Sequence, residues 1–563
     1  MSFLGWFLFF IVLQIIHGLG TFNLYQKAGV KGYKAFIPIY NVIIALRFLE
    51  RPWWWIMLFF LPIINLIIIP VFWIDLLYAF KRNPKPVEML WVTATLGLYL
   101  VPLNFQSETT FQKEREKPEQ TKIGQWLSSL TFAIIAATIV HTYFLQPFAI
   151  PTPSLERTLR VGDFLIVSKF HYGARVPMTA VSTPMVHDTL PILKIKSYLK
   201  NPQLPYMRIP GFQRIKKNDL VVFNWPADTV RQFFVKEAGV QKPIDKKSNY
   251  VKRCVGTPGD TLEIIDGMVY INGELLELDQ RARPMFNHKV VSAKGVSPRL
   301  LADVDADDFM RTFTADQLNQ SQYNALLPYL LGVNQREDGS IELYTSKSGI
   351  PIEILRTNRI ALKEPLKTEI VANMTLQAAD KLRSNSNIDS VYIDLTKKGI
   401  PGYRIFPEHS DYPWNEDQFG PLYLPKKGDV LSLTETNYPL YKKLLRDYEG
   451  YAIERSDNTF YVNGIEQSQF VIKQNYYWMM GDNRDHSEDS RSWGFVPENH
   501  ILGKPVFIWM SWDNFNEGIL SMKPRWERFF TTVKGPGQPR SYLFLFIIGL
   551  VGYYGYRFYK KRK

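Results

Sequence analysis

Cysteine is almost absent from the sequence, because Cys254 is the only one among 563 residues. A single cysteine excludes every disulfide bond within the chain, and its apolar neighbours indicate a small core residue rather than a nucleophile. The eight histidines are scattered, with neither an HExxH pattern nor a pair of cysteines to complete a ligand set. The sequence therefore predicts no metal site and no cofactor.

A nucleic-acid-binding motif is also lacking, although the formal net charge is +14. Much of the basic excess flanks apolar segments, which indicates orientation in a membrane rather than binding to nucleic acid. Hydrophobic residues make up 46% of the chain and charged residues 21%. Because the chain is also too long for one compact domain, this mixture predicts membrane segments joined to a water-soluble part.

Charge is absent from the first 19 residues. The basic start of a secretory signal peptide is therefore missing, and we expect residues 3–20 to form a retained transmembrane helix. The basic residues between Lys27 and Arg51 place the next segment in the cytoplasm. Two further apolar stretches follow, residues 52–80, which contain Pro62 and Pro70, and the shorter residues 89–102. Residues 1–105 are thus predicted to be a membrane region with about three spans.

Residues 126–148 form a second uncharged segment, and we expect them to be a transmembrane anchor. As a helix they reach about 35 Å, enough for the ~30 Å hydrocarbon core of a bilayer. The polar residues 106–125 before them are predicted to be a cytoplasmic linker, and residues 541–556 a C-terminal transmembrane span that returns the basic tail to the cytoplasm. This arrangement leaves residues 149–530 on the extracytoplasmic side.

Residues 149–279 and 456–530 have the pattern of a mainly antiparallel β domain. Short β-branched or aromatic runs follow turns at residues 164–167 and 220–223, and Asp266-Gly267 predicts a hairpin. The segments 269–273 and 460–464 resemble each other and predict two similar hairpins. Between them, residues 280–455 are predicted to be an α+β insertion. Thr314 with Gln317 suggests a capping box before a helix, and residues 440–449 suggest a helix that ends at Gly450.

Three segments of the β domain combine residues that carry chemistry. The first reads Ala-Ile-Pro-Thr-Pro-Ser-Leu-Glu-Arg-Thr-Leu from Ala149. In the second, residues 249–260, Lys252 interrupts an apolar strand, either as a buried base or as a solvent-facing lysine of an edge strand. The third, residues 479–497, contains Gly-Asp-Asn-Arg-Asp-His-Ser-Glu-Asp-Ser-Arg. It does not fit a calcium-binding EF-hand loop, because Ser490 and Val496 stand where that loop needs Gly and Glu.

Together these segments resemble bacterial type I signal peptidases, a Ser-Lys family that removes signal peptides from exported proteins. That family's first box runs Ser-Gly-Ser-Met-x-Pro-Thr-Leu, and residues 152–159 read Thr-Pro-Ser-Leu-Glu-Arg-Thr-Leu. Pro153, Leu155 and Arg157 therefore depart from the family pattern, whereas the second and third segments match almost throughout.

The resemblance implies a membrane-bound serine endopeptidase that cleaves after a small-x-small site through an acyl-enzyme. It also implies a location in the bacterial cytoplasmic membrane, with several spans and the catalytic domain on the periplasmic side. The expected partners are the signal peptides of exported preproteins and the lipid bilayer, with neither nucleic acid nor metal.

The resemblance also implies roles, position by position. Ser154 would be the nucleophile and Lys252 its general base, while Thr152 would stabilise the oxyanion and Ser487 would orient the lysine. Two further groups follow by position. The supporting residues are Asp489, Arg491, Arg253, Asp482 and Arg484. The walls of the substrate pockets are Ile150, Tyr250 and Val251.

Elementary chemistry agrees with a Ser-Lys pair. A serine hydroxyl needs a nearby base, and a lysine serves only when neutral, which at an ordinary pKa of ~10.4 holds for about one molecule in 2,500 at pH 7. Burial lowers that pKa, and the apolar neighbours of Lys252 favour burial. Because Arg157 stands three residues after Ser154, the Ser-x-x-Lys pattern of β-lactamases is missing, and the base must come from a distant strand.

Two other functions compete with this hypothesis. An inactive relative would bind exported proteins at the membrane without cutting them, and the altered first box keeps that alternative open. A transporter would use the N-terminal spans, but these contain few charges, Asp75 among them, and no paired broken helices of the kind that form transport sites.

Overall fold

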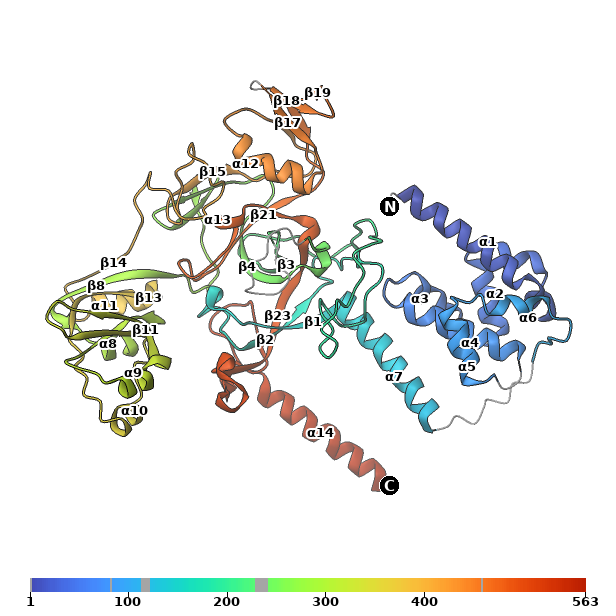
Figure 1. Cartoon of the computed structure of the whole chain (residues 1–563), viewed down its shortest axis with the longest axis horizontal. Helices are drawn as coiled ribbons and strands as arrows, with labels where there is room; N and C mark the ends of the chain where they lie inside the picture. The colour runs from blue at the N-terminus through green and yellow to red at the C-terminus, as the bar shows by residue number, and fades with distance from the viewer. Residues whose placement is uncertain (1–2, 82–83, 113–121, 228–240, 457–458, 563) are drawn as a thin grey trace.

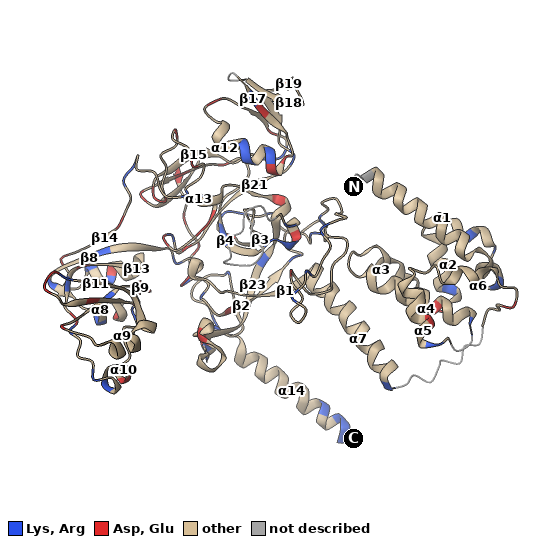
Figure 2. Ribbon diagram, in the orientation of Figure 1, with Lys and Arg blue, Asp and Glu red and all other residues tan. Residues whose placement is uncertain are grey.

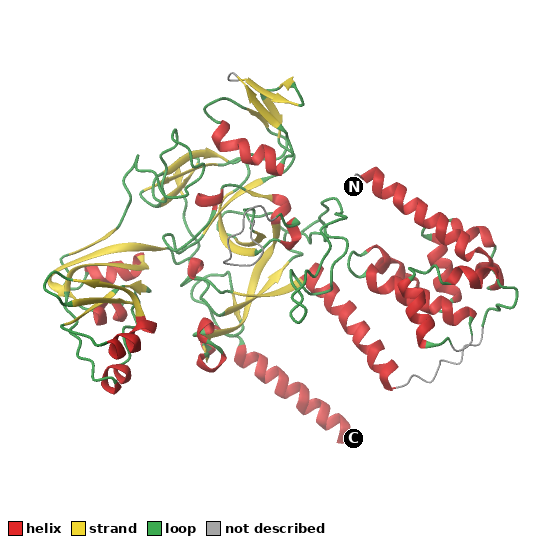
Figure 3. Ribbon diagram, in the orientation of Figure 1, coloured by secondary structure: helices red, strands yellow, loops and turns green. Residues whose placement is uncertain are grey.

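The computed structural model describes residues 3–81, 84–112, 122–227, 241–456 and 459–562. Its centre is a nine-stranded antiparallel sheet with the path β1-β2-β23-β3-β4-β21-β22, and β24 and β25 also pair with β23 (Figures 1 and 3). The strands are β1 Leu145–Ala149, β2 Asp163–Ser168, β3 Leu220–Asn224, β4 Asn249–Gly256, β21 Tyr476–Met480, β22 Val496–Pro497, β23 Ile501–Asp513, β24 Lys523–Pro524 and β25 Thr531–Thr532.

The inner strands of this sheet are apolar and buried along most of their length. Every residue of β3 and of β21 is buried, as are the last five of β4. Strands covered on both faces are expected to be continuously apolar rather than alternating. A charged residue within β4 therefore stands out, and Lys252 lies opposite Val221 of β3.

Two hairpins of similar sequence are confirmed. The first has strands β5 (Thr261–Ile265), β6 (Met268–Ile271) and β7 (Glu274–Leu275), and the second has β17 (Ile453–Ser456), β18 (Thr459–Val462) and β19 (Ile465–Glu466). In both, an Asn-Gly pair with positive φ links the last two strands, at Asn272-Gly273 and Asn463-Gly464. That backbone belongs to the two-residue turn that asparagine and glycine favour.

Residues 285–393 form a lobe beside the central sheet, at the left of Figure 1. One sheet of the lobe has the order β14-β8-β13-β9 and a second has β10-β12-β11, each with its own hydrophobic cluster. The elements are β8 Met285–Val296, α8 Pro298–Asp303, β9 Asp308–Phe309, β10 Arg311–Ala315, α9 Gln320–Leu326, β11 Leu330–Gln335, β12 Ile341–Thr345, α10 Ile352–Thr357, β13 Lys367–Thr375, α11 Leu376–Arg383 and β14 Ser390–Ile393.

The predicted capping box at Thr314 and Gln317 is wrong. Thr314 lies inside β10, and the box that caps α9 is formed by Asn319 and Gln322. The spacing of the two residues was right for a cap, but the pairing of β10 with β12 determines the backbone at Thr314. The helix predicted at residues 440–449 is confirmed as α12 (Tyr438–Lys443) and the π-helical turn Leu444–Tyr448.

The rest of the predicted insertion packs with the hairpins. Strands β15 (Phe419–Tyr423), β16 (Val430–Ser432) and β20 (Gln469–Val471) accompany α12 there. Side chains between Ile405 and Ile472 share one hydrophobic cluster with β5, β6 and β21. The boundaries 149–279, 280–455 and 456–530 stay predictions, and within 280–455 residues 285–393 have hydrophobic clusters of their own.

The N-terminal helices pack around a separate hydrophobic cluster. They are α1 Phe3–Lys27, α2 Tyr40–Phe48, α3 Ile56–Phe60, α4 Asn65–Phe80, α5 Pro86–Ala94 and α6 Leu100–Phe105. The apolar stretch 52–80 is interrupted between α3 and α4, where Pro62 lies, while Pro70 is inside α4. Residues 113–121 of the predicted linker lie outside the described residues.

Two described helices are long and apolar enough to cross a membrane, Leu4–Lys27 and Lys122–Phe144. The second consists of α7 (Lys122–Ile139) and a π-helical turn, Val140–Phe144. The predicted anchor, 126–148, begins within this helix but extends past its C-terminal end at Phe144. From Leu145 the chain is strand β1, because its residues pair with β2. The C-terminal helix α14 spans Leu543–Arg562, with basic residues in its last turn (Figure 2).

Candidate active site

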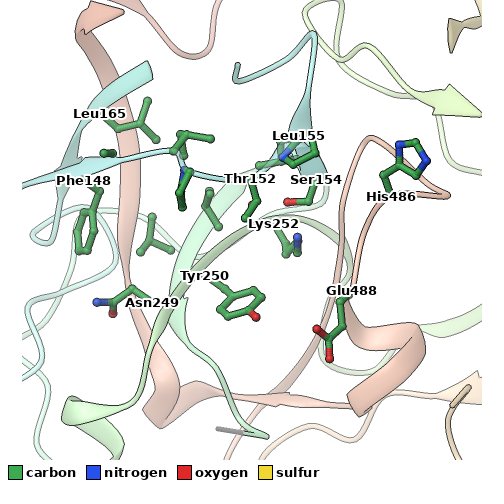
Figure 4. Close-up of a pocket in the computed structure, with 16 residues that line it drawn as sticks. Phe148, Thr152, Ser154, Leu155, Leu165, Asn249, Tyr250, Lys252, His486 and Glu488 are labelled. Carbon is green, nitrogen blue, oxygen red and sulfur yellow. The ribbon is translucent and has the colours of Figure 1, made fainter. Parts of the chain in front are cut away.

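A cleft of about 300 Å³ lies between the segment that follows β1 and strand β4. Its walls are mainly apolar, and its polar groups lie mostly at the end where Ser154 and Lys252 lie, with Asn249 apart from them on the side of Phe148 (Figure 4). The lining residues are Phe148, Ala149, Ile150, Pro151, Thr152, Pro153, Ser154, Leu155, Leu165, Val222, Asn249, Tyr250, Val251, Lys252, His486 and Glu488.

Ser154 lies in a short 3₁₀ turn, Pro153–Leu155, and is 9% exposed. Pro153 occupies the first position of this turn, where its fixed φ suits the helical backbone and its missing N–H is not needed. Asn483 holds the turn from the other side: its backbone N–H donates to the Ser154 carbonyl at 3.1 Å, and its side-chain amide donates to the Pro153 carbonyl at 3.2 Å. The proline in the first box thus fits the turn that carries the serine.

Lys252 lies in β4 between β3 and β21 and is 2% exposed, so it is not a solvent-facing lysine of an edge strand. Burial lowers its pKa from 10.5 to about 8, an effect that the charge of Asp489 opposes. Its amine lies 5.6 Å from the centre of the Tyr250 ring. In Figure 4 the side chains of Ser154 and Lys252 point toward each other. A buried amine that is readily neutral thus faces a serine hydroxyl.

Ser487 lies near the backbone of Ser154, beside Gly481. Its hydroxyl is buried and has no hydrogen-bond partner among the described residues. A side chain at Gly481 would overlap both the Ser487 hydroxyl and the Ser154 carbonyl, so glycine there lets the two segments approach. An unpaired buried hydroxyl costs free energy and calls for an explanation.

Two buried ion pairs support the site from beneath. Arg253 contacts Asp482 with two hydrogen bonds of 2.7 and 2.6 Å. Arg491 contacts Asp489 with two of 2.9 Å, and Asp489 also accepts the Gly481 N–H at 3.0 Å. The arginines hold the pKa of each carboxyl below its ordinary value, against the opposing effect of burial. Paired in this way, the four buried charges fix the backbone around Gly481.

Arg484 completes this support by contacting backbone. Its guanidinium donates to the Gly267 carbonyl at 3.2 Å, and its own carbonyl accepts from Arg491 at 2.6 Å. Burial lowers the pKa of Arg484 to about 10, with the charge of Arg491 as the next cause. These contacts connect the third segment to the first hairpin.

The remaining predicted residues line the cleft itself. Ile150 is buried, while Tyr250, Val251 and Thr152 are half-buried. A mainly apolar cleft of this kind can receive the side chains of a bound peptide. The structure thus brings every predicted site residue into the cleft or directly beneath it.

Sequence reasoning missed Asn483, which lies inside the third segment but was assigned no role. It also missed Thr158, whose hydroxyl donates to Asp482 at 2.6 Å and accepts the Arg283 N–H at 3.0 Å. No local signal marks these two residues, because their partners are distant in the sequence. Cys254 is buried, and burial raises the pKa of its thiol well above the ordinary value, as suits a core residue.

Comparison with known proteins agrees with these motifs. Residues 123–323 and 426–512, just over half of the chain, match the family described as "Signal peptidase, peptidase S26". Residues 33–114 match a family of unknown function.

Relatives with curated descriptions share long stretches with this chain. Signal peptidase I of Haemophilus influenzae is 24% identical over 439 residues, which are 76% of this chain and 81% of the relative. Signal peptidase I of Buchnera aphidicola is 22% identical over 411 residues, covering 73% and 82%. Signal peptidase I of Pseudomonas aeruginosa is 21% identical over 430 residues, covering 74% and 82%.

Proposed function

The chain belongs to the signal peptidase family, and on that premise we propose that Ser154 and Lys252 perform its peptide-bond cleavage. As a member of the family it is a serine endopeptidase of the signal peptidase I type, which removes signal peptides from exported preproteins. The observation that carries the assignment of residues is the burial of Lys252 in a cleft shared with Ser154.

In the acylation step, neutral Lys252 accepts the proton of the Ser154 hydroxyl as its oxygen attacks the carbonyl carbon of the scissile bond. The negative charge on the carbonyl oxygen is stabilised by the Ser154 N–H and the Thr152 hydroxyl. Protonated Lys252 then gives its proton to the leaving amine, the C–N bond breaks, and the signal peptide is left as an ester on Ser154.

Deacylation reverses the proton transfers. Lys252, neutral again, accepts a proton from water as the water oxygen attacks the ester carbonyl. The proton returns to Ser154 when the C–O bond breaks, and the signal peptide leaves as a carboxylic acid. Ser487 holds the amine in line through both steps, with its hydroxyl as the acceptor, while the Asp489–Arg491 and Arg253–Asp482 pairs and Arg484 keep the surrounding backbone in place.

We further propose that the substrate lies extended along the cleft, between residues 148–152 and 249–252. Ile150, Tyr250 and Val251 surround the side chains just before the scissile bond, so only small residues fit there. This agrees with cleavage after a small-x-small site.

The protein is associated with a membrane, and we propose the finer arrangement from the sequence pattern. Residues 1–105 contain about three spans, residues 106–125 lie in the cytoplasm and α7 crosses to the extracytoplasmic side. The cleft follows the end of α7 directly in the chain. The side-chain amide of Asn516 donates to the Pro151 carbonyl at 3.1 Å, and the same loop exposes Ile519 and Leu520. An apolar loop beside the cleft suits an enzyme that meets its substrate at the bilayer surface.

Cysteine labelling tests this orientation, since Cys254 is buried and gives little background. In spheroplasts, a membrane-impermeant maleimide should label Ser410→Cys directly and Glu108→Cys only after permeabilisation. Both positions are exposed in the structure. The reverse pattern would overturn the proposed orientation while leaving the enzyme chemistry untouched.

A cleavage assay tests the assignment of the two catalytic residues. Detergent-purified protein is mixed with a preprotein that carries an Ala-x-Ala site, and mass spectrometry locates the cut. Ser154→Ala and Lys252→Met should each abolish cleavage, whereas the exposed control changes Ser410→Ala and Lys294→Met should not. Binding without cleavage by the wild-type protein would favour the inactive scaffold, and cleavage by Ser154→Ala would mean a different nucleophile.

A further inference from the structure

Arg157 stands where the family's first box has proline, and the backbone of the turn accounts for the absence of proline but not for the choice of arginine. Its φ is +67°, a left-handed conformation. Proline, which the family's box has here, is held near −65° by its ring and cannot adopt this backbone. This backbone does not favour arginine either, because a non-glycine residue at positive φ costs on the order of 1 kcal/mol of conformational free energy. A favourable contact of the side chain offsets this strain.

That contact reaches the lobe of residues 285–393. The Arg157 guanidinium donates to the Asp305 carbonyl at 2.7 Å and to the Asp307 carboxylate at 2.8 Å. The ion pair is well covered, with side-chain exposures of 18% for Arg157 and 15% for Asp307. A covered, charge-assisted contact is stronger than an exposed surface pair, whose contribution is usually small.

Asp307 is itself anchored in the lobe. Its backbone N–H donates to the Asn373 carbonyl of β13 at 2.8 Å, and β9, which follows it, pairs with the same strand. Lys347 approaches the same carboxylate at 3.7 Å. The sheet of the lobe therefore holds the backbone of Asp307 in place, and the Asp307 carboxylate in turn positions the Arg157 side chain.

The lobe also contacts the site at its entry strand, β8. The Met285 N–H donates to the Asp482 carbonyl at 2.9 Å, and the Asn287 N–H donates to the Asp485 carboxylate at 2.7 Å. Within the described residues, the lobe thus contacts the segment beneath Ser154 and, through Arg157, the chain just after the turn that carries Ser154. Two attachments fix an orientation that one alone would leave free to rotate.

The Arg157–Asp307 pair has capacity for a further bond. Arg157 Nε and Asp307 Oδ2 are both buried, and neither has a hydrogen-bond partner among the described residues. A small rotation would let the two groups form the bidentate arrangement that arginine and carboxylate favour.

We propose that Arg157 is a positioning residue through which the lobe of residues 285–393 holds the nucleophile turn in its reactive geometry. The inference rests on the proposed role of Ser154. Arg157 itself does not line the cleft. The inserted lobe then acts on catalysis at a distance: it orders the two residues between Ser154 and Arg157, and a displacement of about 1 Å at a reacting atom can cost about a hundredfold in rate.

The experiment measures kcat and KM of the detergent-purified full chain on a peptide with an Ala-x-Ala site. Arg157→Ala and Asp307→Ala should each lower kcat by about tenfold or more and change KM little. The double variant should be no slower than the slower single variant, because both changes remove one contact. Arg157→Lys, which keeps a donor for Asp307, should recover part of kcat.

A matched control is Glu364→Ala, which removes the bidentate ion pair between Arg311 and Glu364 of the same lobe, 2.7 Å for each bond. It should leave kcat unchanged, and the pH dependence of every variant should match that of the wild type, since Lys252 is not touched. An unchanged kcat in Asp307→Ala, or an equal loss in the control, would overturn the proposal. Cleavage by Ser154→Ala would instead overturn the proposed nucleophile.

Discussion

The pH dependence of cleavage follows from the burial of Lys252. With a pKa of about 8 in place of 10.5, the neutral fraction of this lysine at pH 7 is about 300-fold larger than that of an exposed lysine. The rate of acylation should therefore rise about tenfold per pH unit below pH 8 and level off above it. The assay is kcat/KM for an Ala-x-Ala peptide between pH of about 6 and 10. A midpoint near 6.5, typical of histidine, or a flat profile would refute the role of Lys252.

The same shift has a consequence for stability. The folded state binds the lysine proton more weakly than the unfolded chain does, because burial lowers the pKa. The cost to the fold is therefore fully present below a pH of about 8 and is lost as the pH rises through 10.5. The drop from 10.5 to about 8, at about 1.36 kcal/mol per unit, gives about 3 kcal/mol.

Lys252→Met removes this cost along with the activity. At pH 7 we expect the variant to be more stable than the wild type by up to about 3 kcal/mol. The gain should shrink toward zero as the pH approaches 10.5. Thermal unfolding in detergent at both pH values measures the difference. A destabilised variant at pH 7 would mean that the lysine is held by favourable contacts and that its pKa is not lowered.

Three further predictions concern residues around the pair. Ser487→Ala should lower kcat by about 10- to 100-fold without loss of stability, because its hydroxyl has no partner among the described residues whose bond would be lost; an unchanged kcat would remove it from the mechanism. Asp482→Ala leaves Arg253 buried without its partner and should lower the free energy of unfolding by about 3–5 kcal/mol, as urea denaturation can measure; a loss below about 1 kcal/mol would show that water replaces the pair. Ile150→Ala should admit larger side chains before the scissile bond, visible as a raised kcat/KM for a Val-x-Ala site relative to Ala-x-Ala; an unchanged ratio would place the pocket elsewhere.

The parts of the fold that could be predicted from the sequence are those set by local chemistry. The Asn-Gly turns at 272–273 and 463–464 need a positive φ that asparagine and glycine readily adopt, so these hairpins could be predicted from the dipeptide and its flanking strands. The helix at 438–448 could also be predicted from local sequence, because its residues have a helical pattern and a glycine follows it. The burial of Lys252 could be expected because its neighbours are apolar.

Contacts between distant segments could not be predicted in the same way. The helix that begins at Lys122 ends at Phe144, and the next residues pair with β2. Pro147 is a local signal that the helix ends before it, but the pairing with β2 cannot be predicted from residues 145–148 alone. Asn483 reaches the turn of Ser154 across more than 300 residues of sequence. Arg157 finds Asp307 only because β9 and β13 bring that carboxylate to the surface of the lobe. Such pairings depend on the whole fold, whereas a sequence motif contains at most one of the two residues that form the contact.

The central claim, that Ser154 is the nucleophile, is tested most directly by trapping the acyl-enzyme. A single turnover on an Ala-x-Ala peptide is stopped with acid after milliseconds, and the digested protein is mapped by mass spectrometry. We expect an adduct with the mass of the acyl part of the substrate on the peptide that contains Ser154, present in the wild type and absent from Ser154→Ala. An adduct on another residue, or its survival in Ser154→Ala, would contradict the assignment.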